Sequence, residues 1–267
     1  MRILAACGTE GMLTWDGGWR SMACPLEQVT LLTACGCPAD TRARRLWDGT
    51  RMLPLPPGAE AAMHLCGRWM VLSGEADSLW VMDESGRPLV CAPCGVYPQD
   101  MCPAGECLAV CGGADSRVHM LSLPDARTLG TVAVPGNVQR IAAQGERLCV
   151  LSAAGEERIR CLAGTISLRT GRYEPLLTLP GLPGAVCAAG RGAWWIAASE
   201  RLCLADSRGR VLRMLPGQGL IHSLSVHGET LLAADPVLGA CTLVDLRNRR
   251  APVQLPAGEV CMAVMVP

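Results

Sequence analysis

The residues that could do chemistry recur at a regular spacing and do not meet in one motif. Four aspartates each open a short polar turn between two apolar runs, namely Asp40, Asp77, Asp115 and Asp235. The Ala-Asp-Ser triplets at 76–78 and 114–116 lie 38 residues apart. If such turns gather on one face of the fold, a ring of carboxylates could hold a cation or a basic partner. Aspartate followed by Ser, Thr or Pro is also good turn chemistry, and this structural role is the interpretation that we prefer.

Cysteine is the commonest potential metal ligand, with 16 residues. Cys91 and Cys94 have the spacing of a zinc-binding pair, and Cys102, Cys107 and Cys111 follow. A structural zinc site needs four ligands in a tetrahedral array, and no second pair of that spacing follows. Most of the cysteines lie inside apolar runs, where they act as small hydrophobic residues. We therefore expect no metal, no cofactor and a reducing, cytoplasmic location.

The stretch 67–98 shows which elements position these residues. It contains three apolar runs, at 67–73, 79–82 and 88–91, separated by two turn signals, a pattern typical of an antiparallel meander. A fourth run precedes each such meander and follows a recurring Pro-Gly phrase, as at 57–58 and 135–136. Each unit therefore has four strands, which we label A to D, and about 40 residues. That is the size of one blade of a β-propeller.

Six units are recognisable between about residues 21 and 257. In the first of them we place strand A at 21–27, strand B at 29–35 and a turn at 38–41. A lone strand A remains at 260–266, and two apolar runs remain at 3–7 and 12–15. Since unpaired strand edges are costly, we expect these termini to pair and form a seventh blade with one strand missing or poorly formed.

The predicted fold is therefore all-β, with residues 1–267 forming a single β-propeller domain. We expect seven four-stranded blades, closed by pairing of the N- and C-terminal strands. Six blades are the alternative if the termini only decorate the ring.

The ends of the third strands point to a family resemblance. These strands end in aspartate at 81–83 (Val-Met-Asp), 204–206 (Leu-Ala-Asp) and 243–245 (Leu-Val-Asp). With this ending, the repeats resemble those of the YVTN or YncE-type propellers of bacteria, which are broadly WD40-like. The resemblance covers nearly the whole chain. The Tyr-Val-Thr-Asn tetrad itself is absent, as is the Gly-His signature of WD40 blades. The resemblance implies a seven-bladed repeat protein of the protein-binding kind.

In a propeller, strand A of each blade is innermost, so polar residues near its start can face the central channel. Six residues have this position in the predicted blades: Glu60, Asp100, Gln139, Arg140, His222 and Glu259. A polar channel mouth could bind a ligand, although a channel filled with water would also be polar. The chain has no Ser-His-Asp order, phosphate loop or His-Glu metal motif.

Two functions follow from this pattern. The first is a non-catalytic scaffold or binding module that presents the D–A connections and B–C turns to a protein or small ligand. The alternative is a lactonase or lyase with its site at the channel mouth, because a fold alone does not decide function.

Charge and hydropathy narrow the classes of partner. The 24 basic and 24 acidic residues balance, and no aromatic residues alternate with the basic ones, which argues against nucleic acid. No apolar run approaches the ~18 residues of a membrane span. Residues 4–7 resemble the cleavage box of a bacterial lipoprotein, but the apolar stretch before them is too short for a signal peptide. We expect a monomer that does not bind membranes.

Overall fold

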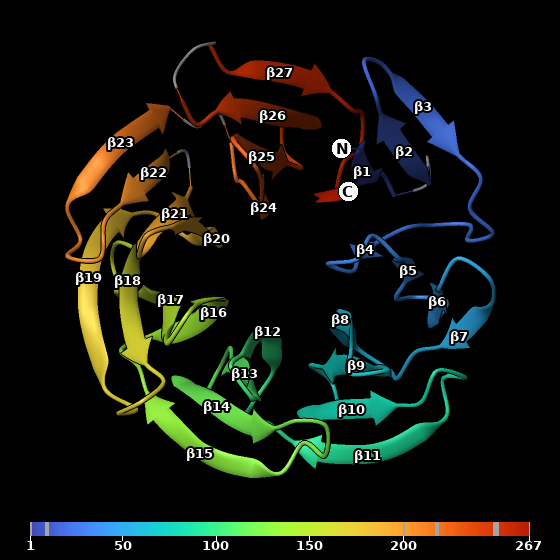
Figure 1. The fold of residues 1–267 in the computed structure, drawn as a ribbon, viewed down its shortest axis with the longest axis horizontal. Helices are drawn as coiled ribbons and strands as arrows, with labels where there is room; N and C mark the ends of the chain where they lie inside the picture. The colour runs from blue at the N-terminus through green and yellow to red at the C-terminus, as the bar shows by residue number, and fades with distance from the viewer. Residues whose placement is uncertain (1, 9–10, 200, 217–218, 248–250, 267) are drawn as a thin grey trace.

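The computed structural model describes residues 2–8, 11–199, 201–216, 219–247 and 251–266. In this part of the chain, seven four-stranded antiparallel sheets lie around a central axis (Figure 1). The structure therefore confirms the predicted seven-bladed β-propeller and excludes the six-bladed alternative. Strand A of each blade is nearest the axis and strand D is outermost.

The seven blades follow one another around the ring, each built from four strands in the order A to D. Blade 1 is β4 (Leu31–Leu32), β5 (Pro38–Asp40), β6 (Arg45–Trp47) and β7 (Met52–Pro54); blade 2 is β8 (Ala59–Leu65), β9 (Arg68–Ser73), β10 (Ser78–Met82) and β11 (Pro88–Pro93). Blade 3 is β12 (Pro98–Ala104), β13 (Cys107–Gly112), β14 (Arg117–Ser122) and β15 (Thr128–Ala133); blade 4 is β16 (Asn137–Gln144), β17 (Arg147–Ala154), β18 (Arg160–Ser167) and β19 (Tyr173–Pro180). Blade 5 is β20 (Pro183–Gly190), β21 (Ala193–Ala198), β22 (Arg201–Ala205) and β23 (Val211–Pro216); blade 6 is β24 (Ser223–His227), β25 (Thr230–Asp235), β26 (Ala240–Asp245) and β27 (Val253–Pro256). Blade 7 is β28 (Met262–Val266), β1 (Arg2–Ala6), β2 (Met12–Trp15) and β3 (Trp19–Met22).

Blade 7 closes the ring with strands from both ends of the chain, as predicted. Strand β28 pairs antiparallel with β1, from Arg2 opposite Val266 to Ala6 opposite Met262, and the two termini lie side by side (Figure 1). The expectation that this blade lacks a strand is wrong. Strand β3 (Trp19–Met22) pairs with β2 and completes the blade. The prediction assigned residues 21–27 to strand A of blade 1, whereas residues 21 and 22 belong to the outer strand of blade 7.

The strands of blade 1 also differ from the prediction. The apolar run 29–35 is not strand B; it contains the short strand A, β4, and the turn that follows it. Pro38, predicted to lie in a turn, begins strand B opposite Leu32. A proline is acceptable there because the first residue of a strand need not donate to the ladder. The uninterrupted apolar run hides the turn, which the left-handed backbone of Gly36 makes possible (φ +86°).

The core lies between neighbouring blades. Successive side chains of a strand point to opposite faces, so the two indoles of β21 enter different layers. Trp194 packs with Cys149 and Leu151 of blade 4, and Trp195 packs with Leu231 of blade 6. Both tryptophans are fully buried. Blade 5 is therefore held to both of its neighbours by the same strand.

The recurring Pro-Gly phrase joins strand D of one blade to strand A of the next. The Ser73 hydroxyl, at the end of strand B, donates to the Pro57 carbonyl at 2.6 Å. Ser152 makes the same bond to the Pro135 carbonyl in blade 4. The B–C turns and D–A connections therefore lie on one face of the ring, which we call the D–A face.

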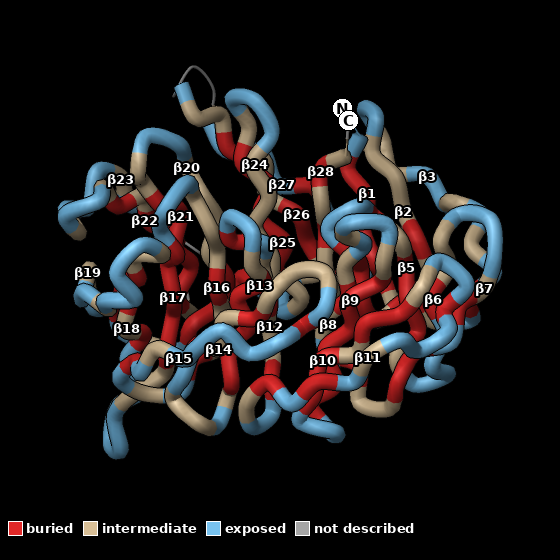
Figure 2. Tube along the Cα trace, turned by 60° about the horizontal axis from the view of Figure 1, so that its bottom comes forward, coloured by how far each residue is buried: buried red, intermediate tan, exposed pale blue. Residues whose placement is uncertain are grey.

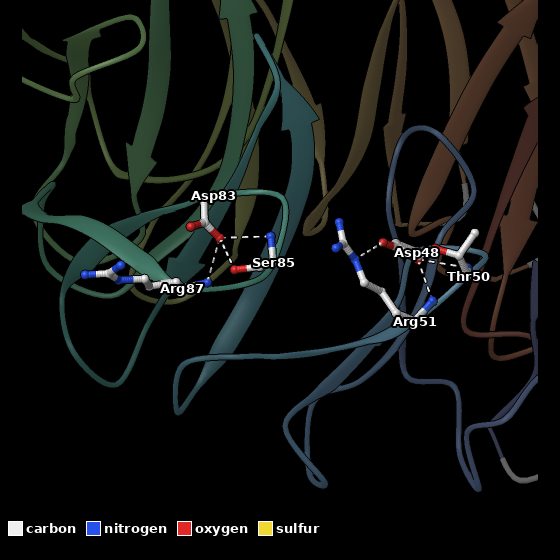
Figure 3. Close-up of polar contacts among 6 residues, drawn as sticks. All are labelled: Asp48, Thr50, Arg51, Asp83, Ser85 and Arg87. Carbon is white, nitrogen blue, oxygen red and sulfur yellow. Dashed lines mark hydrogen bonds and ion pairs between the residues drawn. The ribbon is translucent and has the colours of Figure 1, made fainter.

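The aspartates that end strand C cap the C–D turn on the opposite face (Figure 3). Asp83 accepts hydrogen bonds from the Ser85 hydroxyl at 2.6 Å and from the Ser85 and Arg87 amides. Asp48 accepts bonds from the Thr50 hydroxyl and from the Thr50 and Arg51 amides at 2.8 Å, and its other oxygen accepts the Arg51 guanidinium. The position that carries the family resemblance therefore has a structural role in these blades.

We predict that the pKa of the Asp48 carboxyl is well below that of an ordinary aspartate. Slight burial raises its pKa, but the hydrogen bonds from Arg51 and Thr50 outweigh this and lower the pKa to about 2. Because the pKa is lower in the folded chain, these bonds stabilise the fold above the unfolded value of ~4 and are lost as pH falls toward 2. A carbon-13 NMR titration of the Asp48 carboxyl should have its midpoint near pH 2 and shift upward in Thr50→Val. A midpoint near pH 4 would contradict the cap.

Among the described residues there is no helix long and apolar enough to cross a membrane.

Candidate functional site

A cavity of about 530 Å³ occupies the central channel. The starts of the innermost strands line it, with residues from all seven blades. Five of the six residues predicted to face the channel are among the lining residues: Glu60, Asp100, Gln139, Arg140 and His222. The sequence pattern thus placed these side chains in one cavity, although whether they bind a ligand stays a prediction.

A repeated β-bulge turns polar residues into this cavity. In blades 2, 3, 4 and 5 the pairing of strand A with strand B shifts by one residue, at Glu60, Gln99, Gln139 and Gly184. His222 takes the same position in blade 6. Its amide donates to the Ala234 carbonyl, and the next residue, Ser223, is the one that pairs with Ala234. Bulges of this kind re-aim a side chain and are frequent beside functional sites. In this channel the bulges present one Glu and two Gln to one cavity, and His222 lines the same cavity from the equivalent position.

Glu259 does not line the cavity. Strand β28 begins at Met262, so Glu259 lies upstream in the connection from blade 6 and is exposed. Cys261 takes the position equivalent to His222, since its amide donates to the Ala6 carbonyl opposite Met262. Counting from the repeat phrase missed this because the connection in blade 7 has a different length.

Asp100 and Arg140 connect neighbouring blades. Asp100 accepts hydrogen bonds from its neighbour Met101 at 2.9 Å and from the Ile141 amide of blade 4 at 3.1 Å. The Arg140 guanidinium donates to the Gly184 carbonyl of blade 5 at 2.9 Å and to the Gln139 carbonyl at 2.8 Å. These two charged groups therefore hold three innermost strands together in addition to lining the cavity.

Burial shifts the protonation of two groups in the cavity. It raises the pKa of Asp100, although the positive charge of Arg140 and the bonds from Ile141 and Met101 oppose the shift. Burial also lowers the pKa of His222, an effect that Arg140 reinforces and the carboxylate of Asp235 opposes. Burial therefore favours the neutral imidazole of His222, which can both donate and accept a hydrogen bond.

Asp77 and Asp115, the B–C turn carboxylates of blades 2 and 3, fix the connection between those blades. Asp77 accepts the Tyr97 amide at 2.7 Å, and Asp115 contacts the His119 ring at 2.8 Å and accepts the Val96 amide at 3.4 Å. The Tyr97 hydroxyl in turn donates to Glu60 at 3.0 Å. Tyr97 therefore contacts a residue that lines the cavity, Glu60, and the turn aspartates hold its loop in place.

Asp40 and Asp235 are buried, and their carboxylates accept hydrogen bonds from backbone amides of the turns that they open. Asp40 accepts the Ala43 amide at 2.8 Å, and Asp235 accepts the Val237 and Leu238 amides. None of the four B–C turn aspartates lines the channel cavity. Their contacts are those of turn and loop anchors, and a role in binding a cation or a basic partner stays a prediction.

In the described part of the chain, no three His, Cys, Asp or Glu side chains lie close enough together to hold a metal ion. The Cys91 and Cys94 pair is divided, because Cys91 is exposed and Cys94 lies in the core between blades 2 and 3. Burial raises the pKa of Cys94 to about 12. A buried neutral thiol of this kind is a packing residue.

Sequence reasoning missed three residues of this region: Gln99, Ser223 and Tyr97 as a contact of Glu60. Gln99 could have been found, since it lies one repeat after Glu60 and one before Gln139. Ser223 bridges to blade 7 by accepting the Ala263 amide at 3.1 Å and donating to the Ala263 carbonyl. A lone serine gives no signal of such a bridge in the sequence.

Exposed apolar side chains are distributed unequally between the two faces. Among the described residues, the large apolar side chains that are exposed and lie in loops are Val96, Tyr97, Ile159, Leu182, Val237 and Leu238. All six belong to B–C turns or D–A connections. The other exposed large apolar residues lie in the outer strands β11, β15, β23 and β27. Exposed loops border both ends of the ring (Figure 2), but only the D–A face carries this apolar set.

Comparison with known proteins shows the fold. No protein-family profile and no curated protein sequence matches the chain. Solved structures do: the computationally designed protein Ika8 is similar at a TM-score of 0.72 and 11% identity, with 96% of this chain and 84% of that one covered. Apo AztD from Citrobacter koseri is similar at a TM-score of 0.62 and 11% identity, over 98% and 97% of the two chains.

A candidate 6-phosphogluconolactonase from Bacteroides fragilis is similar at a TM-score of 0.71 and 8% identity, over 98% of this chain and 96% of that one. At these identities the likeness concerns the backbone fold alone. The function of each protein depends on its own side chains. The structure and the comparisons together show that this chain is a seven-bladed β-propeller.

Proposed function

We propose that the protein is a non-catalytic binding module whose partner covers the D–A face around the channel. One observation carries the proposal: every exposed large apolar side chain found in a described loop belongs to this face. Surface apolar residues that gather on one face mark interaction sites. Aromatic residues such as Tyr97 are also enriched in interfaces between proteins.

The loops of this face are built to keep one shape. The connection through Val96 and Tyr97 is held by Asp77 and Asp115, and its two carbonyls accept the Ala114 and Gly113 amides. A surface that is already ordered loses less entropy when a partner binds. The cavity beside Tyr97 could then accept one side chain or a small ligand of that partner.

We further propose that the chain is a YVTN or YncE-type propeller that acts as one domain in the cytoplasm. The capping aspartates at the ends of strands C support the family. Core cysteines such as Cys149 and Cys203, which are fully buried as thiols, support a reducing compartment.

The alternative is an enzyme of the lactonase kind, like the candidate lactonase with the same fold. The shared cavity of Asp100, Arg140 and His222 favours it. Against it, the oxygens of Asp100 accept backbone amides and the guanidinium of Arg140 donates to two carbonyls. Both groups are thus engaged in holding blades together, so neither is arranged to assist His222 in acid–base catalysis.

A pair of matched variants tests the binding module. Leu182→Glu with Val237→Glu places charges on the D–A face, and Leu129→Glu with Leu212→Glu places the same charges on outer strands, where the side chains are also exposed. Proteins captured by the tagged wild type should be lost from the first variant and kept by the second. Titration of the identified partner should show at least a roughly tenfold weaker affinity for the first variant only.

Equal capture by both variants would contradict the proposal. Hydrolysis of a sugar lactone by the wild type, abolished in His222→Asn, would establish the enzyme instead. Self-association of the wild type that is lost in the first variant alone would identify the partner as a second copy of the chain.

A further inference from the structure

Cys35 and Cys37 bring two thiols together at the surface, in the A–B turn of blade 1. Their sulfur atoms are 3.6 Å apart and share a hydrogen bond. Cys35 is exposed and Cys37 is partly buried. The exposed Cys66 has no second thiol hydrogen-bonded to it among the described contacts, and Cys94 is enclosed by the core.

The turn fixes the two thiols in this arrangement. The Thr33 amide donates to the Cys37 carbonyl at 3.0 Å, and the Gly36 amide donates to the Thr33 carbonyl at 2.8 Å. The Thr33 hydroxyl accepts the Cys37 amide at 2.9 Å and lies 3.1 Å from the Cys35 sulfur, to which it can donate. Gly36 packs against Leu4 and Val266, so the turn rests on the strands that close the ring.

The same contacts favour a thiolate at Cys35. The hydrogen bond with Cys37 lowers the pKa of Cys35 well below the ordinary thiol value; partial burial opposes the shift and the Thr33 hydroxyl supports it. The hydrogen bond with Cys35, followed by burial, raises the pKa of Cys37. A proton shared between two sulfurs has this effect, because it stabilises the first thiolate and resists loss of the second proton.

We propose that Cys35 and Cys37 form a redox-active dithiol that exchanges with low-molecular-weight disulfides. In the first step the Cys35 thiolate attacks one sulfur of the disulfide; a mixed disulfide forms, and one small thiolate leaves and takes up a proton. In the second step Cys37 loses its proton and attacks the Cys35 sulfur, and the second small thiol leaves. Two protein thiols are oxidised and one disulfide is reduced to two thiols.

The geometry suits the second step. The sulfurs must close from 3.6 Å to the ~2.05 Å of a disulfide, so only a small movement of the two side chains is needed. Ala34, in the same turn, lines the channel cavity. Oxidation would therefore alter a segment that contacts the candidate site.

The test uses glutathione redox buffers on the folded full chain. Trypsin releases residues 21–42 as one peptide, which also contains Cys24, so the measurement is made in a Cys24→Ser background. With rising glutathione disulfide, mass spectrometry should show that this peptide loses two hydrogens and carries no glutathione. Cys66, in the separate peptide 52–68, should carry glutathione only.

Two further variants separate the roles of the thiols. Cys37→Ser should stop the reaction at a mixed disulfide on Cys35, and Cys35→Ser should leave Cys37 largely unmodified. Alkylation of wild-type Cys35 at pH 6 should be roughly tenfold or more faster than alkylation of Cys66, because the rate follows the thiolate fraction. If a variant fails to fold, the result in the Cys24→Ser background alone still decides.

The proposal is overturned if the 21–42 peptide stays reduced at ratios where Cys66 is modified. It is equally overturned if both Cys35 and Cys37 carry glutathione, or if Cys35 and Cys66 alkylate at the same rate. None of these outcomes bears on the binding module, whose test uses other residues.

Discussion

Met265→Asp is expected to destabilise the protein by about 4 kcal/mol, because it places a charge in the seam that closes the ring. Met265 lies opposite Ile3 in the pairing of β28 with β1, is only 7% exposed, and packs against the core shared with Leu255 of blade 6. Removing a buried methionine costs ~2–5 kcal/mol, and an unpaired buried carboxylate adds to this. Stabilities of whole domains are only ~5–15 kcal/mol, so the variant should be close to unfolding.

Urea denaturation followed by tryptophan fluorescence measures this effect as a lower midpoint. Val253→Asp is the matched control, since Val253 lies in the outer strand β27 and is 50% exposed; its effect should stay within ~0.5 kcal/mol. Met265→Leu conserves the volume and should cost less than ~1.5 kcal/mol. A Met265→Asp midpoint equal to that of Val253→Asp would mean that the terminal strand is not docked.

Gly136→Ala is expected to cost about 3 kcal/mol, which would explain why the Pro-Gly phrase recurs. Gly136 has φ +77°, and an added Cβ would overlap the carbonyl oxygen of Ala153 in the neighbouring strand. The left-handed backbone alone costs an L-residue ~1–2 kcal/mol. The overlap adds ~1–3 kcal/mol because backbone atoms of the sheet must move.

Gly145→Ala separates these two contributions within the same blade. Gly145 also has positive φ (+56°), but no atom lies within 4 Å of an added Cβ. Its substitution should therefore cost only the backbone share of ~1–2 kcal/mol, again measured by urea denaturation. Equal effects of the two substitutions would show that conformation, and not the close approach to Ala153, requires a glycine in the D–A connection.

The sequence was enough to predict the propeller because the blade is a local structure. Each meander is encoded by alternating apolar runs and turn residues within about 40 positions, and the pattern repeats. Closure also followed, since an unpaired strand at each end of the chain has one obvious partner. Blade 1 was misread because its strands are two or three residues long, too short for a period to be visible.

The candidate site could be predicted only in part. The spacing of the repeat places Glu60, Asp100, Gln139, Arg140 and His222 in the channel, since equivalent positions of strand A meet there. The contacts of these residues could not be predicted, because they run between blades: Asp100 to Ile141, Arg140 to Gly184 and Tyr97 to Glu60. Contacts between blades depend on the twist and bulging of each sheet, which apolar periodicity does not encode.

The sequence by itself determined the architecture, the number of strands in a blade and the face on which a ligand would be sought. Only the tertiary structure decided which turn and loop amides the recurring B–C aspartates bind. It also showed that the exposed apolar loop residues belong to the D–A face and that the sulfur atoms of Cys35 and Cys37 lie 3.6 Å apart. The physical reason is the same in each case: repeat patterning fixes which strand a residue belongs to, whereas side-chain chemistry depends on which neighbour the folded ring brings within hydrogen-bonding distance.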